Sequence, residues 1–352
     1  MKRILINILT GLNLAAIILL ITAYLSVYIS PEDWWLPSFF GLAYPVILII
    51  NLFFVLMWLI INPRYLWISL VAILAGWGFL TRFIQISGKR IDSGDINVLS
   101  YNVQYFAGKG IESQKETAGN IKQFLKDQQP DIICLQEVRL RKNDIFNLAL
   151  TVEDINSINH YQYARSSKTY GSVTMTRYPI INMGEIRFEN SRNISIYTDV
   201  LIDEDTVRIF NVHLQSYNMD PDRYTIIDSG IDEEEDLREV HDIWYRFKKG
   251  FALRAQQVRT IRRYIEESPY HIIICGDFND TPASYSYRQL RKGLKDAFVS
   301  SGTGVGRTYI GKLPSFRIDY IFHSRGFESY NFKTIDFRYS DHLPVSCSLV
   351  KK

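Results

Sequence analysis

Polar side chains lie at the ends of several apolar runs, and their chemical types limit what the chain can do. They are the carboxylates, amides and imidazoles of Asn102, Glu137, His213, Asp277, Asn279, Asp319, Asp341 and His342. Each one ends, follows, precedes or lies within a run of apolar residues that is typical of a buried strand. Because an isolated charge is costly to bury, this pattern indicates side chains that converge on one site.

The donor atoms of this set favour a hard divalent cation. Oxygen ligands predominate, and the cysteines, Cys134, Cys275 and Cys347, lie in apolar runs without the spacing of a metal site. Mg²⁺ and Mn²⁺ prefer such oxygen ligands, whereas zinc favours thiolates and imidazoles. The sequence has no Gly-x-Ser-x-Gly turn and no Gly-rich phosphate loop. These observations favour metal-assisted attack by water on a phosphorus centre.

The elements that must position these side chains begin at residue 96. We predict strands at 96–103, 131–138, 171–176, 194–202, 206–214, 270–276, 316–323, 328–337 and 344–350. The spacing of apolar residues predicts helices at 116–128 and around 236–267. Many strands with interspersed helices indicate two sheets packed face to face, with helices on their outer faces.

Six short motifs occur in the order of a known superfamily. They are Ser100-Tyr101-Asn102, Leu135-Gln136-Glu137-Val138, Asn211-Val212-His213-Leu214, Gly276-Asp277-Phe278-Asn279-Asp280-Thr281-Pro282, Arg317-Ile318-Asp319-Tyr320-Ile321 and Ser340-Asp341-His342-Leu343-Pro344. In this order they resemble the endonuclease/exonuclease/phosphatase superfamily, which includes pancreatic-type DNase, abasic-site endonucleases, neutral sphingomyelinases and inositol polyphosphate 5-phosphatases. The resemblance covers about residues 96–350. It implies a four-layer α/β/β/α sandwich and a metal-dependent hydrolase of phosphoester bonds.

The resemblance also implies a role for each matching residue. Glu137 would be the main carboxylate ligand of Mg²⁺ or Mn²⁺, with Asn102 beside it and Asp341 at the edge of the metal site. Asp277 would orient and deprotonate the attacking water, and Asn279 would hydrogen-bond a phosphate oxygen or the nucleophile.

Two imidazoles would act on the phosphate. His342 would contact it, with Asp319 holding the other ring nitrogen and fixing its tautomer. His213 would contact the phosphate or serve the leaving group. The alternative for His213, a purely structural histidine at a strand end, stays open from the sequence.

The first 86 residues differ sharply from the rest in charge. Their only charged side chains are Lys2, Arg3, Glu32, Asp33, Arg64 and Arg82, whereas the whole chain has 40 basic and 37 acidic residues. The charge-free runs are Ile4–Ile29, Trp34–Ile61 and Tyr65–Thr81. About 20 apolar residues cross the hydrocarbon core, and the third run reaches this length if Arg82 snorkels and the helix continues to Ile86. We therefore predict three transmembrane helices before the sandwich.

The basic residues suggest an orientation for these helices. Lys2 and Arg3 favour a cytoplasmic N-terminus, so three spans would place the catalytic domain outside the cytoplasm. Arg82, Lys89 and Arg90 beyond the third run weaken this charge asymmetry. The predicted division of the chain is a three-span anchor at 1–86, a linker at 87–95 and an endonuclease/exonuclease/phosphatase domain at 96–352.

We therefore expect an integral membrane phosphoesterase that depends on Mg²⁺ or Mn²⁺. Its partners would be the lipid bilayer and a phosphoester substrate, which is a lipid head group, a nucleotide or nucleic acid; no protein partner is evident. The alternatives are a membrane-tethered DNase-type nuclease and a non-catalytic binding module on the same fold. Outside the anchor the charge is nearly balanced, which disfavours strong non-specific binding of nucleic acid.

Overall fold

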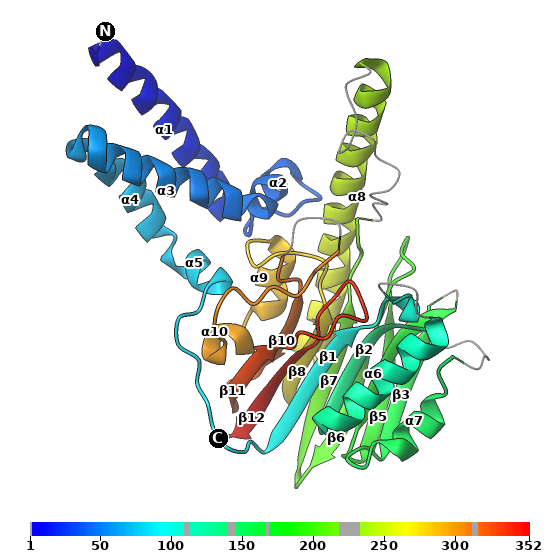
Figure 1. Cartoon of the computed structure of the whole chain (residues 1–352). Helices are drawn as coiled ribbons and strands as arrows, with labels where there is room; N and C mark the ends of the chain where they lie inside the picture. The colour runs from blue at the N-terminus through cyan, green and yellow to red at the C-terminus, as the bar shows by residue number, and fades with distance from the viewer. Residues whose placement is uncertain (1, 109–112, 140–144, 167–168, 218–232, 312–315) are drawn as a thin grey trace.

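The computed structural model describes residues 2–108, 113–139, 145–166, 169–217, 233–311 and 316–352. In these ranges the chain forms a group of helices at the N-terminus and an α/β domain that begins at residue 96 (Figure 1). The strands and both helices predicted in this domain occur near their expected positions. The structure adds elements that the sequence patterns did not indicate: β3 (His160–Arg165), β5 (Ile180–Arg187), β9 (Lys295–Asp296), α7 (Leu148–Asp154), α9 (Tyr285–Arg291) and α10 (Ala297–Ser301).

Two six-stranded sheets form the centre of the domain. The first has the order β11-β12-β1-β2-β4-β3 and the second has the order β5-β6-β7-β8-β10-β9. The strands of the first are β1 (Ile96–Asn102), β2 (Ile132–Arg139), β3 (His160–Arg165), β4 (Tyr170–Thr176), β11 (Phe327–Thr334) and β12 (Val345–Lys351). Those of the second are β5 (Ile180–Arg187), β6 (Ile194–Ile202), β7 (Asp205–His213), β8 (His271–Asp277), β9 (Lys295–Asp296) and β10 (Asp319–His323).

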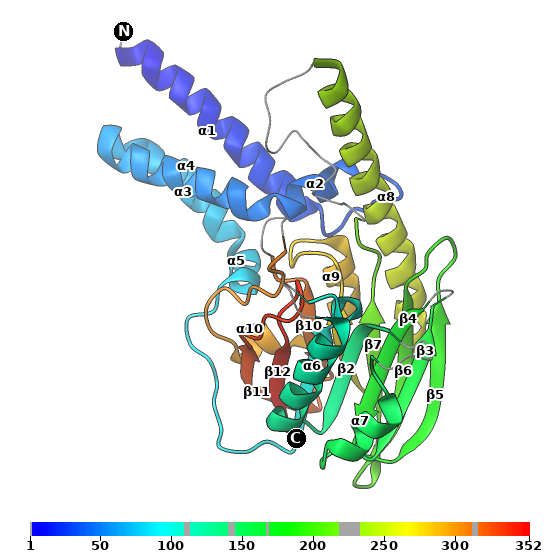
Figure 2. The ribbon, with the colours of Figure 1, turned by 45° about the vertical axis from the view of Figure 1, so that its right-hand side comes forward.

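Apolar side chains fill three layers of this domain. The layer between the sheets includes Val98, Ile209 and the buried thiols of Cys134 and Cys275. A second layer packs the outer face of the first sheet against α6 (Gln114–Gln128) and α7 (Leu148–Asp154). A third packs the second sheet against α8 (Glu233–Glu266) and α9 (Tyr285–Arg291). Helices thus cover both outer faces (Figure 2), which is consistent with an α/β/β/α sandwich.

Strand pairing brings the polar strand ends together. β1 runs parallel to β2 with Asn102 opposite Gln136, and β7 runs parallel to β8 with His213 opposite Asp277. β10 runs antiparallel to β8 and places Asp319 opposite Asp277. The register alone therefore places two carboxylates and an imidazole at one end of the second sheet.

The N-terminal segment forms a bundle of helices. They are α1 (Lys2–Leu25), α2 (Leu36–Leu42), α3 (Tyr44–Ile61), η1 (Pro63–Tyr65), α4 (Leu66–Ala75) and α5 (Trp77–Phe83). Among the described residues, two helices are long and apolar enough to cross a membrane, Arg3–Leu25 and Tyr44–Ile61. The prediction of a third unbroken helix is wrong, because the third apolar run forms two helices, α4 and α5, that are bent by 66° relative to each other. The bend lies at Gly76, where the ring of Tyr24 occupies the space that a side chain would need.

Buried polar side chains join α1, α3 and α4. Asn13 Nδ2 donates to Ser69 Oγ at 2.5 Å, and Trp58 Nε1 donates to Asn13 Oδ1 at 2.9 Å. Asn51 Nδ2 donates to backbone carbonyls of α1 and α3 at 3.0 and 2.9 Å. Within apolar surroundings such hydrogen bonds favour one pairing of the helices over others.

The N-terminal helices rest on the segment that follows β8. Ser26 Oγ donates to the carbonyl of Ala283 at 3.0 Å, and Arg82 Nη1 donates to the carbonyl of Pro282 at 3.3 Å. Arg317 Nη2, in turn, donates a hydrogen bond to the carbonyl of Arg82 at 2.8 Å. On the other side, α2 packs against α8 through stacked aromatic rings (Figure 2). The two parts of the chain therefore share a contact surface beside the strand ends.

Candidate active site

The carboxylate of Asp277, the last residue of β8, lies at the centre of a buried polar cluster. Its Oδ2 accepts hydrogen bonds from Asn102 Nδ2 at 3.0 Å and from Asn279 Nδ2 at 2.9 Å, and its Oδ1 accepts one from the Asn279 backbone at 2.7 Å. Burial raises the pKa of Asp277 to about 6, although the charge of His342 opposes the rise. Asp277 is therefore a carboxylate with a fixed orientation and with a proton affinity suited to general-base chemistry near neutral pH.

The side-chain amide of Asn279 donates hydrogen bonds to other groups of the protein. Its Nδ2 donates to the carbonyl of Leu214 at 2.9 Å as well as to Asp277, so it ties the end of β7 to the segment after β8. Its φ of 51° lies in the left-handed region, which asparagine tolerates better than most residues. The expected hydrogen bond from Asn279 to a phosphate stays a prediction.

The ring of His342 is held between carboxylates. Its Nδ1 lies 2.9 Å from Asp319 Oδ2, and its Nε2 lies 3.7 Å from Asp277 Oδ2. Burial lowers the pKa of His342, but the charges of Asp319, Asp277 and Asp341 outweigh this effect and raise the pKa well above its ordinary value. The ring is therefore oriented by Asp319, and the surrounding carboxylates favour its protonated form, which can donate from Nε2.

Glu137 and His213 face each other across the two sheets. Glu137 lies at an irregularity in the pairing of β2 with β4, and its φ is 54°. Strained backbone and β-bulges of this kind concentrate at functional sites. Its Oε1 lies 3.3 Å from His213 Nε2. Burial raises the pKa of Glu137, but the hydrogen bond and charge of His213, with the charge of His342, hold it below its ordinary value.

A glycine permits the close approach of β7 and β8 at this point. Gly276 has a φ of 140°, and a Cβ atom there would lie 1.9 Å from the carbonyl oxygen of Val212. No other residue type fits without displacing the strands that carry His213 and Asp277.

The structure thus brings all eight sequence-predicted site residues to one end of the sandwich. Asp341 lies at the rim of this cluster, where its Oδ1 is 4.0 Å from His342 Nε2.

The part of the chain that carries this cluster matches a known family. Residues 99–342 match a model described as the endonuclease/exonuclease/phosphatase family, and this segment spans more than half of the chain. The chain belongs to the endonuclease/exonuclease/phosphatase family. Members of this family are generally hydrolases that act on phosphoester bonds.

The N-terminal helices match a separate family model. Residues 6–83 correspond to a domain of unknown function, DUF8431. No curated protein sequence matches the chain.

Solved structures of the family share the fold at low sequence identity. The catalytic domain of human Nocturnin with bound sulfate has a TM-score of 0.53 and 16% identity, with 74% of this chain and 97% of that chain covered. A family protein from Leptotrichia buccalis has a TM-score of 0.50 and 16% identity, with 72% and 99% covered. A functionally unknown conserved protein from Enterococcus faecalis has a TM-score of 0.51 and 14% identity, with 73% and 100% covered. At these identities the likeness shows the fold alone.

Members of the endonuclease/exonuclease/phosphatase family typically use a divalent metal ion, and two groups of residues are relevant here. Asp277, Asp319 and His342 each offer a ligand atom within 4.8 Å of the others. This group is one candidate for a metal site. Glu137 and Asp341 provide two further carboxylates beside it. Burial raises the pKa of Asp341, and the nearby charge of Glu137 raises it further, which is the repulsion that a shared cation would relieve. Carboxylate and amide oxygens such as those of Glu137, Asp341 and Asn102 are the ligand type that Mg²⁺ and Mn²⁺ prefer, so the expected role of these three residues stays a prediction.

Two buried residues beside this cluster were missed by sequence reasoning. Tyr105 follows β1 with a φ of 55°, and its ring packs edge-on against Tyr170 at 4.8 Å. Burial raises the pKa of Tyr105 far above its ordinary value, as does the charge of Glu137, to which its hydroxyl hydrogen-bonds. Arg254 on α8 is fully buried and pairs with Asp280, 3.1 Å away, just beyond the catalytic cluster.

Proposed function

We propose that the protein is a membrane-anchored, divalent-metal-dependent phosphoesterase that hydrolyses a phosphodiester or phosphomonoester by in-line attack of water. The observation that carries this proposal is the position of Asp277, which accepts hydrogen bonds from Asn102 and Asn279 and lies 3.7 Å from the imidazolium of His342. A base beside a cationic donor is the arrangement that hydrolysis of a phosphate ester requires.

In the proposed reaction, Asp277 accepts a proton from the attacking water. Asn102 and Asn279 hold the carboxylate so that one oxygen keeps its direction during the reaction. As the water attacks, negative charge grows on the nonbridging phosphate oxygens. His342 donates from Nε2 to one of these oxygens, and Asp319 keeps the ring charged and fixed through Nδ1.

Glu137, Asn102 and Asp341 would hold the divalent ion. When bound, the ion supplies Lewis-acid polarisation of the phosphoryl group and stabilises developing charge. His213 is held by Glu137 and contacts the phosphate or the leaving oxygen. Burial lowers the pKa of His213, but Glu137 and Asp277 raise it above its ordinary value overall, which favours the protonated ring that donation to the leaving oxygen needs.

The N-terminal helices would anchor this activity in a membrane. We propose that the bent pair of α4 and α5 completes a third crossing. In support, the N-terminus and η1 lie at the far end of the bundle while α2 and α5 lie near the domain (Figures 1 and 2). The proposed division is an anchor at 1–86, a linker at 87–95 and a catalytic domain at 96–352. With Lys2 and Arg3 in the cytoplasm, the catalytic domain is outside it.

The proposal is tested with the full-length chain purified in detergent micelles. Hydrolysis is measured on a panel of substrates, an aryl phosphodiester, an aryl phosphomonoester, a phospholipid, a nucleotide and plasmid DNA, with Mg²⁺, Mn²⁺ or EDTA. We expect EDTA to abolish turnover and Asp277→Asn to lower kcat at least about 100-fold, as is usual when a positioned base is lost. Asp127→Asn, on the exposed face of α6, is the matched control.

Each alternative has its own outcome in this panel. Turnover confined to plasmid DNA, with steep inhibition by salt, would identify a membrane-tethered nuclease. Binding of phosphoesters without turnover under any metal condition would identify a non-catalytic module. Full activity of Asp277→Asn would refute the proposed mechanism.

A further inference from the structure

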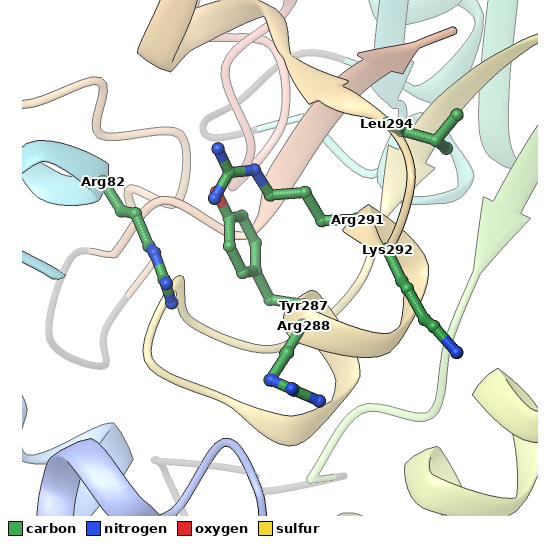
Figure 3. Close-up of a pocket in the computed structure, with 6 residues that line it drawn as sticks. All are labelled: Arg82, Tyr287, Arg288, Arg291, Lys292 and Leu294. Atoms are coloured by element: carbon green, nitrogen blue, oxygen red, sulfur yellow. The ribbon is translucent and has the colours of Figure 1, made fainter. Parts of the chain in front are cut away.

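A cationic cavity lies where the N-terminal helices meet the catalytic domain, away from the cluster around Asp277. It has a volume of about 210 Å³. It is lined by Arg82, Tyr287, Arg288, Arg291, Lys292 and Leu294. Arg82 comes from α5, whereas the others come from α9 and the turn that follows it. Figure 3 shows the guanidinium groups of Arg82 and Arg291 beside the ring of Tyr287, with that of Arg288 farther from the ring and Lys292 pointing away from them.

These cations have no acidic partner among the residues that the structure describes. Asp296 is the nearby carboxylate, but it is engaged by Arg317 at 2.9 Å and by the hydroxyl of Tyr287 at 2.8 Å. Arg82 and Arg291 are close enough for their charges to act on each other. Several like charges near a single carboxylate that Arg317 already pairs repel one another, and a bound anion would relieve that repulsion.

Aromatic rings hold the arginines in place. The guanidinium carbons of Arg82 and Arg291 lie 5.6 and 5.8 Å from the centre of the Tyr287 ring. That of Arg288 lies 4.3 Å from the centre of the Tyr28 ring, which follows α1. Such contacts stabilise a cation without neutralising it, so the N–H groups stay able to donate to an anion.

Two of those donors are buried and have no partner within the described part of the chain. They are the Nε atoms of Arg82 and Arg291. A buried donor without an acceptor is unfavourable by about 1–3 kcal/mol, and a charged one by more. Planar guanidinium groups that converge on one cavity are the donors that recognise phosphate oxygens best.

The position of the cavity indicates where the phosphate comes from. Arg82 lies in the last turn of α5, at the end of the N-terminal bundle that faces the catalytic domain. Tyr28, which holds Arg288, follows the first candidate span at its domain end. In a membrane, both residues would lie at the level of the lipid head groups, where aromatic and cationic side chains collect.

We propose that this cavity binds the phosphate group of an anionic phospholipid, with Arg82, Arg288 and Arg291 as its ligands. The site is separate from the catalytic cluster, although it depends on the membrane placement proposed above. Arg82 also donates to the Pro282 carbonyl, so the bound head group would lie beside the segment that follows Asp277 and Asn279 in the chain.

The test uses the full-length chain in detergent micelles and measures bound lipid by native mass spectrometry. The probes are phosphatidylglycerol, zwitterionic phosphatidylcholine, glycerol phosphate and inorganic phosphate. The variant is Arg288→Gln combined with Arg291→Gln; Arg82 is left intact because it also supports the Pro282 carbonyl. The control is Lys126→Gln combined with Arg325→Gln, which removes the same charge from exposed positions on the catalytic domain.

We expect the wild type and the control to bind phosphatidylglycerol at least ten times more tightly than phosphatidylcholine, and the variant to lose this preference. The preference persisting in the variant would overturn the proposal. Equal displacement of phosphatidylglycerol by inorganic phosphate would overturn the lipid as the source of the phosphate. Because the readout is lipid binding and not hydrolysis, this result is independent of whether the proposed catalysis is found.

Discussion

Replacement of Arg254 by methionine tests how the segment that carries the catalytic carboxylate is held. Arg254 is fully buried; its Nε donates to Asp280 Oδ2 at 3.1 Å, and its Nη1 donates to the carbonyl of Gln215 at 2.8 Å. One guanidinium therefore joins the segment after β7 to the segment after β8. These segments begin directly beyond His213 and Asp277, so the loss of this link affects both stability and catalysis.

The expected loss of stability follows from the buried charge that the substitution leaves without a partner. Methionine replaces much of the buried volume of Arg254 but leaves the carboxylate of Asp280, which is also buried, without its cation. Removing one partner of a buried ion pair lowers stability by about 3–5 kcal/mol. For a domain of this size, each kcal/mol shifts Tm by about 2–4 °C, so we expect a fall of roughly 6–20 °C. Changing Asp280 to Asn in the same chain removes the stranded charge and should recover most of this loss.

The assay is thermal unfolding of the full-length chain in detergent, followed by intrinsic tryptophan fluorescence. Arg254→Met, the double variant Arg254→Met with Asp280→Asn, and Arg263→Met, an exposed control on the same helix, are compared with wild type. The reasoning would be refuted by a Tm for Arg254→Met within roughly 2 °C of wild type. It would equally be refuted by a double variant as unstable as the single one.

Three further outcomes follow from the site. Asp319→Asn should lower kcat by about 10²–10⁴-fold with little change in KM, because the imidazolium of His342 loses the carboxylate that fixes it; steady-state kinetics measure both. Since protonated Asp277 cannot accept a proton, kcat/KM should fall as pH drops through a pKa of about 6, and an acidic limb centred well above that value would contradict this. Gly276→Ala should reduce the yield of folded protein and the Tm, because its Cβ would lie 1.9 Å from the Val212 carbonyl; unchanged Tm would contradict the close approach.

The sequence predicted the parts of the fold that depend on local patterns. Long apolar runs became β1, β2, β7 and β8, because fully buried strands need apolar residues on both faces. The edge strand β3 was not predicted, since its exposed residues alternate with few buried ones and give a weak apolar signal. β5 is also an edge strand and is mostly exposed. The polar residues at the strand ends were predicted from the same pattern as the strands, because a polar or charged residue directly after a long apolar run is easily recognised in the sequence.

Other features of the site depend on contacts that no local pattern records. α8 carries several arginines, and nothing in their spacing distinguishes the fully buried Arg254 from the exposed Arg263. Tyr105 reaches Glu137 because residues 104–106 all have positive φ. Glycine is the usual sequence signal for this backbone conformation, and none of these three residues is a glycine. The lack of a side chain at Gly76, where α4 meets α5, is required by the packing of Tyr24, a residue of a different helix. In each case the deciding partner is distant in the sequence.

The contacts of residues 280–283 connect these observations. Asp280 is held from α8 by Arg254, the Pro282 carbonyl accepts from Arg82, and the Ala283 carbonyl accepts from Ser26. The segment directly after Asp277 is therefore fixed on one side by the domain's own helix and on the other by the N-terminal bundle. The sequence changes from apolar to polar at residues 87–95, but residues before this segment pack against residues after it. The N-terminal helices thus contact the backbone of the segment that follows Asp277 and Asn279, so under the proposed function a displacement of the bundle would also act on the segment next to the proposed catalytic carboxylate.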